Sequence, residues 1–247
     1  SSLRDDGILL IAIENRFGAK YFAGCPEDHT GRIFDGIIGY PDRSPVTFSR
    51  AELKEMLQAA GFKSTQFYHT FPDYKIPETF IRESEEALSL YPHNWIRTPF
   101  EIYGGERLNL MPEPLFIKTL TASKLLWEFS NSFLIVASKD EDADLKTKWL
   151  IKKFFNNDRY NSVFHHEVSL LKGDDNEYQV QRRPLSHGSP AFKYADLDFN
   201  LSEVDRFVPG ELVIYDVYRA LVSKEPEDAV LQITRRVFDS LLSNYST

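Results

Sequence analysis

The stretch that most constrains the fold is an apolar run near the amino end of the chain, ILLIAIEN at residues 8–15. It follows Asp6-Gly7, has the length of a strand and ends in polar residues. A continuous apolar run of this length is typical of a parallel strand buried on both faces. Because such a strand needs neighbours that are reached by crossover connections, we expect further strands of the sheet to precede residue 1.

A long loop and then a capped helix are predicted after this strand. Residues 15–48 contain five glycines and three prolines with no sustained apolar period, and loops of this length are usually functional or disordered. Ser49 begins a helix, because Glu52 can complete a capping box with it. One apolar stripe runs through residues 53–60, and Gly61 ends the helix.

Alternating residues predict a strand at residues 64–71 and a second extended piece near 76–81. Apolar spacing predicts a helix over 113–128, followed by a buried strand at 131–138. The acidic stretch at 139–146 is typical of a solvated boundary between two modules.

The remainder of the chain predicts a smaller module that contains a β-hairpin. Turn residues at 173–176 separate two segments with strand character. A strand is expected at 211–222, followed by a helix that Pro226 opens.

The order of these elements resembles the second half of class I S-adenosylmethionine-dependent methyltransferases, over residues 3–138. It is similar in particular to the methyltransferase domains of bacterial proteins for surface-polysaccharide assembly. The segments that carry the likeness are ENRFGAKYFAGCPEDHTGR at 14–32, TFSRAELKEMLQAAGF at 47–62, FPDYKIP at 71–77 and FSNSFLIVAS at 129–138.

The resemblance implies an α/β fold with a partial, Rossmann-like methyltransferase sheet, consisting only of late strands and helices, in a domain at 1–138. A smaller α+β accessory module with the hairpin follows at 147–247. The implied cofactor is S-adenosylmethionine, but family members place its glycine-rich loop and acidic ribose-binding residue before the point where this sequence starts. The fragment alone is therefore expected to be inactive.

The loop that leaves the first strand is the predicted active-site loop, because ligands of open α/β sheets lie outside the carboxyl ends of the strands. Within it we predict His29 as the general base for methyl transfer to a hydroxyl, since histidine titrates in the useful range. Glu27 or Asp28 is expected to orient its ring. The alternative is that Asp28 and His29 only stabilise the loop, as such residues often do.

The predicted substrate-binding residues lie in the same loop. Arg32 or Arg16 is expected to steer an anionic group of the substrate, and Asn15 lies beside Arg16. Tyr21 and Tyr40 could stack on a sugar ring, although anchoring of the loop explains them equally well. The expected partners are a sugar or glycan acceptor and a glycosyltransferase, as a separate protein or a fused domain.

Charge and cysteine content exclude several other classes of function. The chain has 37 acidic and 29 basic residues, a net charge of −8, which disfavours nucleic acid and anionic membranes as partners. No apolar run approaches the ~20 residues that span a bilayer. Cys25 is the single cysteine, so disulfides and multi-cysteine zinc sites are excluded, no metal is expected, and a cytoplasmic location is predicted.

The other histidine and cysteine residues give little evidence of a nucleophile or a metal site. Cys25 lies near His29, but lone cysteines are usually small buried apolar residues, so a nucleophile is not expected. His165 and His166 would point to opposite faces of a strand and cannot easily share a metal. The competing hypothesis for the whole chain is a non-catalytic module that binds a glycan or a partner enzyme.

Overall fold

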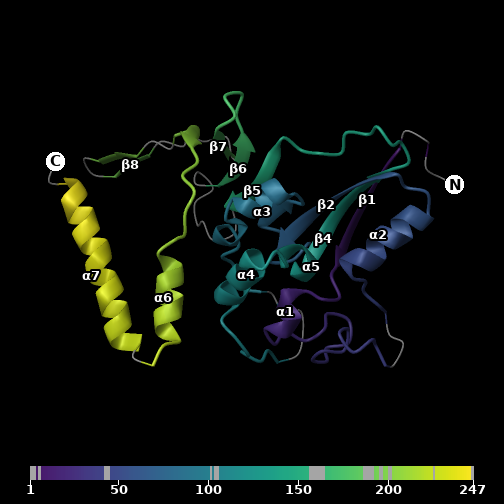
Figure 1. The fold of residues 1–247 in the computed structure, drawn as a ribbon, viewed down its shortest axis with the longest axis horizontal. Coiled ribbons are helices and arrows are strands. Elements are labelled where there is room, and N and C mark those ends of the chain that lie inside the picture. The colour runs from purple at the N-terminus through teal and green to yellow at the C-terminus, as the bar shows by residue number, and fades with distance from the viewer. Residues whose placement is uncertain are drawn as a thin grey trace.

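The fold is mixed α/β and is built on an eight-stranded open sheet in which all neighbouring strands are antiparallel (Figure 1). The structure is a computed structural model. It describes residue 4 and residues 7–41, 45–100, 102, 106–155, 165–185, 192–194, 197–199, 202–224 and 226–245. Asp6, predicted to precede the first strand, lies outside these residues.

The sheet has the strand order β1-β4-β2-β3-β5-β6-β7-β10, and a separate two-stranded sheet pairs β8 with β9. The strands are β1 (Ile8–Glu14), β2 (Ser64–Phe71), β3 (Thr79–Arg82), β4 (Ser132–Ser138), β5 (Trp149–Phe155), β6 (His166–Lys172), β7 (Tyr178–Pro184), β8 (Phe192–Tyr194), β9 (Leu197–Phe199) and β10 (Val204–Arg206).

The helices are α1 (Ala19–Phe22), α2 (Arg50–Ala59), α3 (Glu85–Ser89), α4 (Glu113–Ala122), α5 (Leu126–Phe129), α6 (Ile214–Leu221) and α7 (Pro226–Tyr245), with a 3-10 turn at Pro92–Asn94. Helices α6 and α7 lie side by side at the end of the molecule remote from the N-terminus (Figure 1). None of the described helices has the length and apolar character needed to cross a bilayer.

Helix α2 forms as predicted from its capping signals. The Ser49 side chain accepts a hydrogen bond from the Glu52 backbone, and the Glu52 carboxylate accepts one from the Ser49 backbone, so the capping box is complete. Gly61 follows the helix with φ +87, a left-handed conformation that glycine adopts without steric cost. Leu53 and Leu57 pack against one face of β1, β4 and β2.

The prediction for the first strand is wrong in its environment. Strand β1 is an edge strand within the described sheet, and it pairs antiparallel with β4, from Ile8 opposite Ser138 to Glu14 opposite Ser132. Its burial alternates, and Ile8 and Leu10 are 56% and 64% exposed. The apolar run was expected to be buried on both faces, but α2 covers only the face of Leu9, Ile11 and Ile13.

The Rossmann-like sheet is likewise not supported. Sheets of that type are mainly parallel, whereas every hydrogen-bonded strand pair here is antiparallel. What the structure shows is the coarser statement, a mixed α/β fold with helices packed on an open sheet.

Sheet and core continue across the predicted module boundary. The acidic stretch 139–146 connects β4 to β5, and β5 pairs with β3. The larger core cluster includes Phe71 and Ile117 on one side of this stretch and Ile151 and Leu170 on the other. The two expected domains, 1–138 and 147–247, thus contribute strands to one sheet.

The second half confirms the hairpin and corrects one element. Strands β6 and β7 pair from His166 opposite Pro184 to Lys172 opposite Tyr178, around the predicted turn at 173–176. The final helix begins at Pro226, as expected. Residues 211–222, predicted as a strand, instead contain α6, whose apolar residues lie on one side and pack against α4 and α7.

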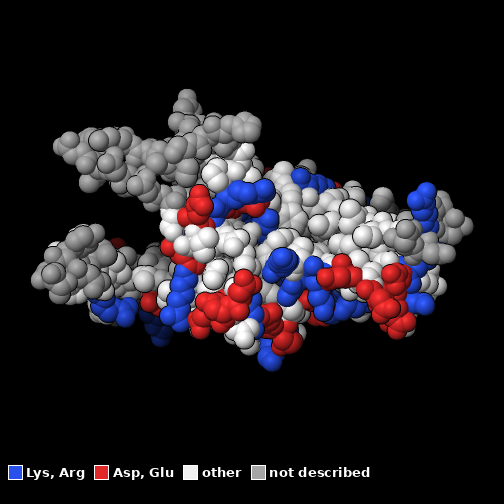
Figure 2. All heavy atoms as spheres, turned by 90° about the horizontal axis from the view of Figure 1, so that it is seen from above, with Lys and Arg blue, Asp and Glu red and all other residues white. Residues whose placement is uncertain are grey.

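Acidic and basic side chains are interspersed over the face of the molecule seen in Figure 2. Although the chain has a net charge of −8, this face therefore shows no single acidic patch.

Candidate functional site

Strands β1 and β2 finish at the same end of the sheet, and the predicted active-site loop begins there. Both strands are antiparallel to β4, so they run in the same direction. Glu14 is the last residue of β1, and β2 is followed by a cis Phe71-Pro72 bond and Asp73. Asn131, just before β4, joins α1 to the segment after β2: its Nδ2 donates to the Pro72 carbonyl (2.8 Å), and its Oδ1 accepts from the Lys20 backbone (2.9 Å).

Five charged side chains meet at this end of the sheet and are here called the charged cluster: Glu14, Lys20, Asp28, Asp73 and Lys75. Lys20 is fully buried, and its Nζ lies 2.7 Å from both Asp28 Oδ2 and Asp73 Oδ2. Lys75 is about one-third exposed, and its Nζ lies 2.6 Å from Glu14 Oε1 and 3.3 Å from Asp28 Oδ2. Three carboxylates and two ammonium groups are thus locked together, mostly away from water.

The imidazole of His29 lies at the rim of the charged cluster. Its Nε2 is 3.9 Å from Glu14 Oε1, and its side chain is 38% exposed whereas that of Glu14 is 4% exposed. Burial acts to raise the pKa of Glu14, but the hydrogen bond and charge of Lys75 hold that pKa below its usual value. Glu14 therefore stays ionised at neutral pH beside an accessible imidazole.

Glu27 holds the backbone of the loop rather than the His29 ring. Its Oε2 accepts hydrogen bonds from the backbone N–H groups of His29 (2.7 Å) and Thr30 (2.8 Å). Its Oε1 accepts one from the Tyr40 hydroxyl (3.0 Å), which also contacts Thr47 Oγ1 at 2.6 Å. Asp28, the other residue predicted to orient the ring, pairs with two lysines instead. The carboxylate near the ring is Glu14.

The predicted substrate-binding residues mostly hold the loop in place. Asn15 is fully buried, and its Nδ2 donates to the carbonyls of Glu128 and Ser130, both at 2.8 Å. Arg16 ties the loop to α2 through Glu52 Oε1 at 3.0 Å. Tyr40 is buried and bonded to Glu27. The polar side-chain atoms of Asn15 and Tyr40 are thus engaged within the protein.

Tyr21 and Arg32 differ from that group. The Tyr21 hydroxyl is buried and has no hydrogen-bond partner within the described residues. Burial, reinforced by Asp28 and Glu27, raises its pKa far above the usual value, so the hydroxyl stays protonated. Arg32 is exposed, beyond the turn that its carbonyl closes by accepting the Glu27 backbone N–H at 2.9 Å. Of the predicted residues, His29 and Arg32 are the two that solvent reaches readily.

Sequence reasoning missed Glu14, Lys20, Asp73 and Lys75 as members of the site. The signal for Glu14 was its place at the end of the first strand, and Asp73 and Lys75 belong to the FPDYKIP segment that carries the family resemblance. Their mutual contact depends on β4, which follows almost sixty residues later and brings the two strand ends together. Cys25, at 1% exposure, packs in the larger core, as predicted for a small buried apolar residue.

A second polar cluster resembles a nucleophilic arrangement but is closed to substrates. His69 Nδ1 lies 2.7 Å from Ser130 Oγ, and its Nε2 lies 3.2 Å from Glu83 Oε2. Both His69 and Ser130 are completely buried, and the His69 ring stacks on Trp127. Arg50 forms a two-pronged ion pair with Glu83. The Ser130 hydroxyl is therefore not accessible to a substrate. The cluster instead stabilises the junction of α2, β2 and β3.

Within the described residues, no group of three or more His, Cys, Asp or Glu side chains could hold a metal ion. No family model, curated protein or solved structure matches the chain.

Proposed function

We propose that the chain is part of an S-adenosylmethionine-dependent methyltransferase that acts on a sugar or glycan hydroxyl, with His29 as general base. The observation that carries this proposal is the accessible His29 imidazole beside the ionised, buried Glu14 carboxylate, where β1 and β2 end. Family resemblance of the sequence over residues 3–138 adds the reaction class.

Sheet geometry near the site supports the proposal. Strands β1 and β2 run parallel, helix α2 connects them, and β4 is inserted between them in the opposite direction. Such an arrangement is compatible with the late strands of a methyltransferase sheet, although the sheet as a whole is antiparallel. The outer edge of β1 is unpaired within the described sheet, and an apolar edge strand of this kind is suited to receive another strand.

The residues at the site do not fit the nucleotide of the methyl donor. Nucleotide cradles use glycine-rich turns and the N-terminus of a following helix, but α1 after β1 has only four residues. A Cβ on Gly18, just before α1, would lie 3.2 Å from the Asn131 backbone, so this turn is already filled. We therefore derive no step through the donor.

The chemistry that the chain itself supplies is activation of the acceptor. The His29 imidazole takes the proton of the acceptor hydroxyl, through the ring nitrogen that does not face Glu14, as that oxygen becomes the nucleophile. The resulting imidazolium is stabilised by the negative charge of Glu14, much as a buried carboxylate stabilises the catalytic histidine of a Ser-His-Asp triad. Arg32 lies on the same loop and is placed to attract an anionic part of the acceptor.

The test is methyl transfer from isotopically labelled S-adenosylmethionine to sugar acceptors by the native protein, with and without His29→Ala. Loss of a general base lowers the rate by about 100-fold to 10,000-fold. Thr30→Ala, one residue along the same loop, is the matched control and should retain the rate. An unchanged rate for H29A in a folded protein would contradict the assignment of His29 as general base.

A non-catalytic module that binds a glycan or partner enzyme is the second candidate. It is favoured by a broad polar hollow of about 1,080 Å³ over β5, β6 and β7, lined by Trp149, Gln179 and Gln181 among others. Under that function H29A would leave the activity of the native protein intact, and substitutions in the hollow would weaken binding of the glycan or partner enzyme. We further propose a cytoplasmic location, in keeping with the presence of a single cysteine, Cys25.

A further inference from the structure

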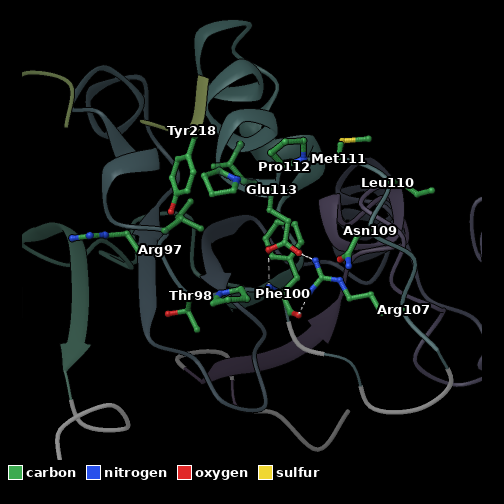
Figure 3. Close-up of a pocket in the computed structure, with 14 residues that line it drawn as sticks. Arg97, Thr98, Phe100, Arg107, Asn109, Leu110, Met111, Pro112, Glu113 and Tyr218 are labelled. Carbon is green, nitrogen blue, oxygen red and sulfur yellow. Dashed lines mark hydrogen bonds and ion pairs between the residues drawn. The ribbon is translucent and has the colours of Figure 1, made fainter. Parts of the chain in front are cut away.

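A cavity of about 600 Å³ lies between two loops, the start of α4 and the Tyr218 ring on α6 (Figure 3). The loops are residues 96–100 and 107–112. Its volume falls in the usual range for small-molecule sites. It contains none of the residues of the charged cluster and none of the predicted site residues.

Flat apolar surfaces form much of the cavity wall. Phe100 is 3% exposed, Ile96 and Ile117 are also buried, and Pro99, Pro112 and Pro114 add rigid rings. The aromatic ring of Tyr218 closes the side formed by α6 (Figure 3). Rigid rings lose little conformational entropy when a ligand binds against them.

Three planar polar side chains lie among these apolar surfaces. Arg107 and Glu113 point toward one another and form an ion pair (Figure 3). The Phe100 backbone fixes both, because its carbonyl accepts from Arg107 at 3.1 Å and its N–H donates to Glu113 at 2.9 Å. The amide of Asn109, beside them, makes no hydrogen bond within the described part of the chain, and neither does the Tyr218 hydroxyl.

We infer that this cavity binds a single neutral sugar ring. The ion pair of Arg107 and Glu113 cancels its own charge, and the guanidinium of Arg97 extends away from the other labelled side chains (Figure 3). An amide and a phenol hydroxyl both donate and accept, so their best partners are hydroxyl groups, which do the same. The apolar ring faces of a sugar match Phe100, Tyr218 and the prolines.

The cavity wall is also tied to the loop of His29. The Leu108 N–H donates to the Gly24 carbonyl at 3.0 Å, and the Leu110 N–H donates to the Ala23 carbonyl at 3.3 Å. Residues 23–24 continue directly into the segment that carries Glu27 and His29. A sugar in the cavity would therefore belong to the glycan acceptor. That role rests on the proposed function, whereas sugar binding itself does not.

The experiment is saturation-transfer NMR of the protein with methyl glycosides of glucose, galactose, mannose and rhamnose, with tetrahydropyran as a ring without hydroxyls. At least one glycoside should bind, and tetrahydropyran should not. Asn109→Ala and Tyr218→Ala should each weaken binding about tenfold, the effect of losing a hydrogen bond or a ring contact. Asn176→Ala, on the distant hairpin turn, is the control and should bind normally.

Absence of binding by every glycoside up to about 50 mM, well above a millimolar Kd, would overturn the inference, as would binding that N109A and Y218A leave unchanged. Tyr218→Phe, which keeps the ring, guards against misfolding of Y218A and should lose less affinity. Sugar binding without any methyl transfer by the native protein would instead refute the proposed function and leave this site standing.

Discussion

The ammonium of Lys20 and the carboxylate of Asp73 lie 2.7 Å apart, and neither side chain is exposed to solvent. The pair joins α1 to the turn after β2, and Asp28 approaches the same ammonium from the loop that carries His29. Charges buried this deeply are tolerated only while each keeps its partners. The position of the loop that carries His29 thus depends on a lysine that no substrate can reach.

Lys20→Met should therefore destabilise the fold strongly. Removing one partner of a buried pair costs about 3–5 kcal/mol, because Asp28 and Asp73 would be left facing each other without a cation. Urea unfolding measures this. The double variant K20M/D73N should recover part of the loss. Lys146→Met, at an exposed position, is the control, and a loss for K20M as small as that of K146M would contradict the prediction.

Glu14→Gln and Glu27→Gln should separate catalysis from loop stability. E14Q removes the negative charge near the His29 ring, so under the proposed function we expect the methyl-transfer rate to fall about tenfold or more. E27Q disturbs acceptors for two backbone N–H groups and the Tyr40 hydroxyl. It should lower the free energy of unfolding by about 1–3 kcal/mol. The reverse pattern would mean that Glu27 serves the ring.

Local signals predicted the local structure well. The Ser49 and Glu52 capping box is complete, and the hairpin around 173–176 pairs as expected, because these features depend on residues close in sequence. The environment of β1 was mispredicted because its partner β4 lies more than a hundred residues away. An apolar run alone does not distinguish an interior strand from an edge strand with one covered face.

The site was only partly predicted, because it too depends on contacts between residues far apart in the sequence. The loop position of His29 followed from chain order, but its neighbour Glu14 could be recognised only once the end of β1 and the loop were placed together. Lys75 and Asp73 come from the end of a different strand. Residues 211–222 were mispredicted as a strand because their aromatic and β-branched residues also suit an amphipathic helix, and packing on α4 and α7 decides the outcome.

Gly24→Ala should disrupt the contact between the His29 loop and the cavity wall. Gly24 has φ +104, and a Cβ there would lie 1.8 Å from the Leu108 carbonyl oxygen, so one of the two segments must move. Gly39→Ala is a matched control, since Gly39 has φ +93 and open space around it. We expect G39A to cost about 1–2 kcal/mol through backbone strain alone, and G24A to cost clearly more in thermal or urea unfolding. Equal losses would show that the close approach has no energetic weight.

The buried pair of His69 and Glu83 should make the fold sensitive to acid. Burial lowers the pKa of His69 below its usual 6.5, although the Glu83 carboxylate opposes this shift. Burial acts to raise the pKa of Glu83, but hydrogen bonds from Arg50 and His69 hold it well below its usual 4.5. Both groups bind protons more weakly in the folded state than in the unfolded state. Their contribution is therefore complete above pH 6.5 and is lost as the pH falls.

Two pH ranges follow from these shifts. As the pH drops below about 6.5, the His69 contribution declines first, and that of Glu83 declines below about 4.5. His69→Gln cannot titrate, so its free energy of unfolding should change less between pH 7.5 and pH 5 than that of the unmodified protein. The comparison is between slopes, so a lower overall stability of H69Q does not obscure it. Urea unfolding at several pH values measures both slopes, and parallel slopes would show that His69 is not the group that acid protonates.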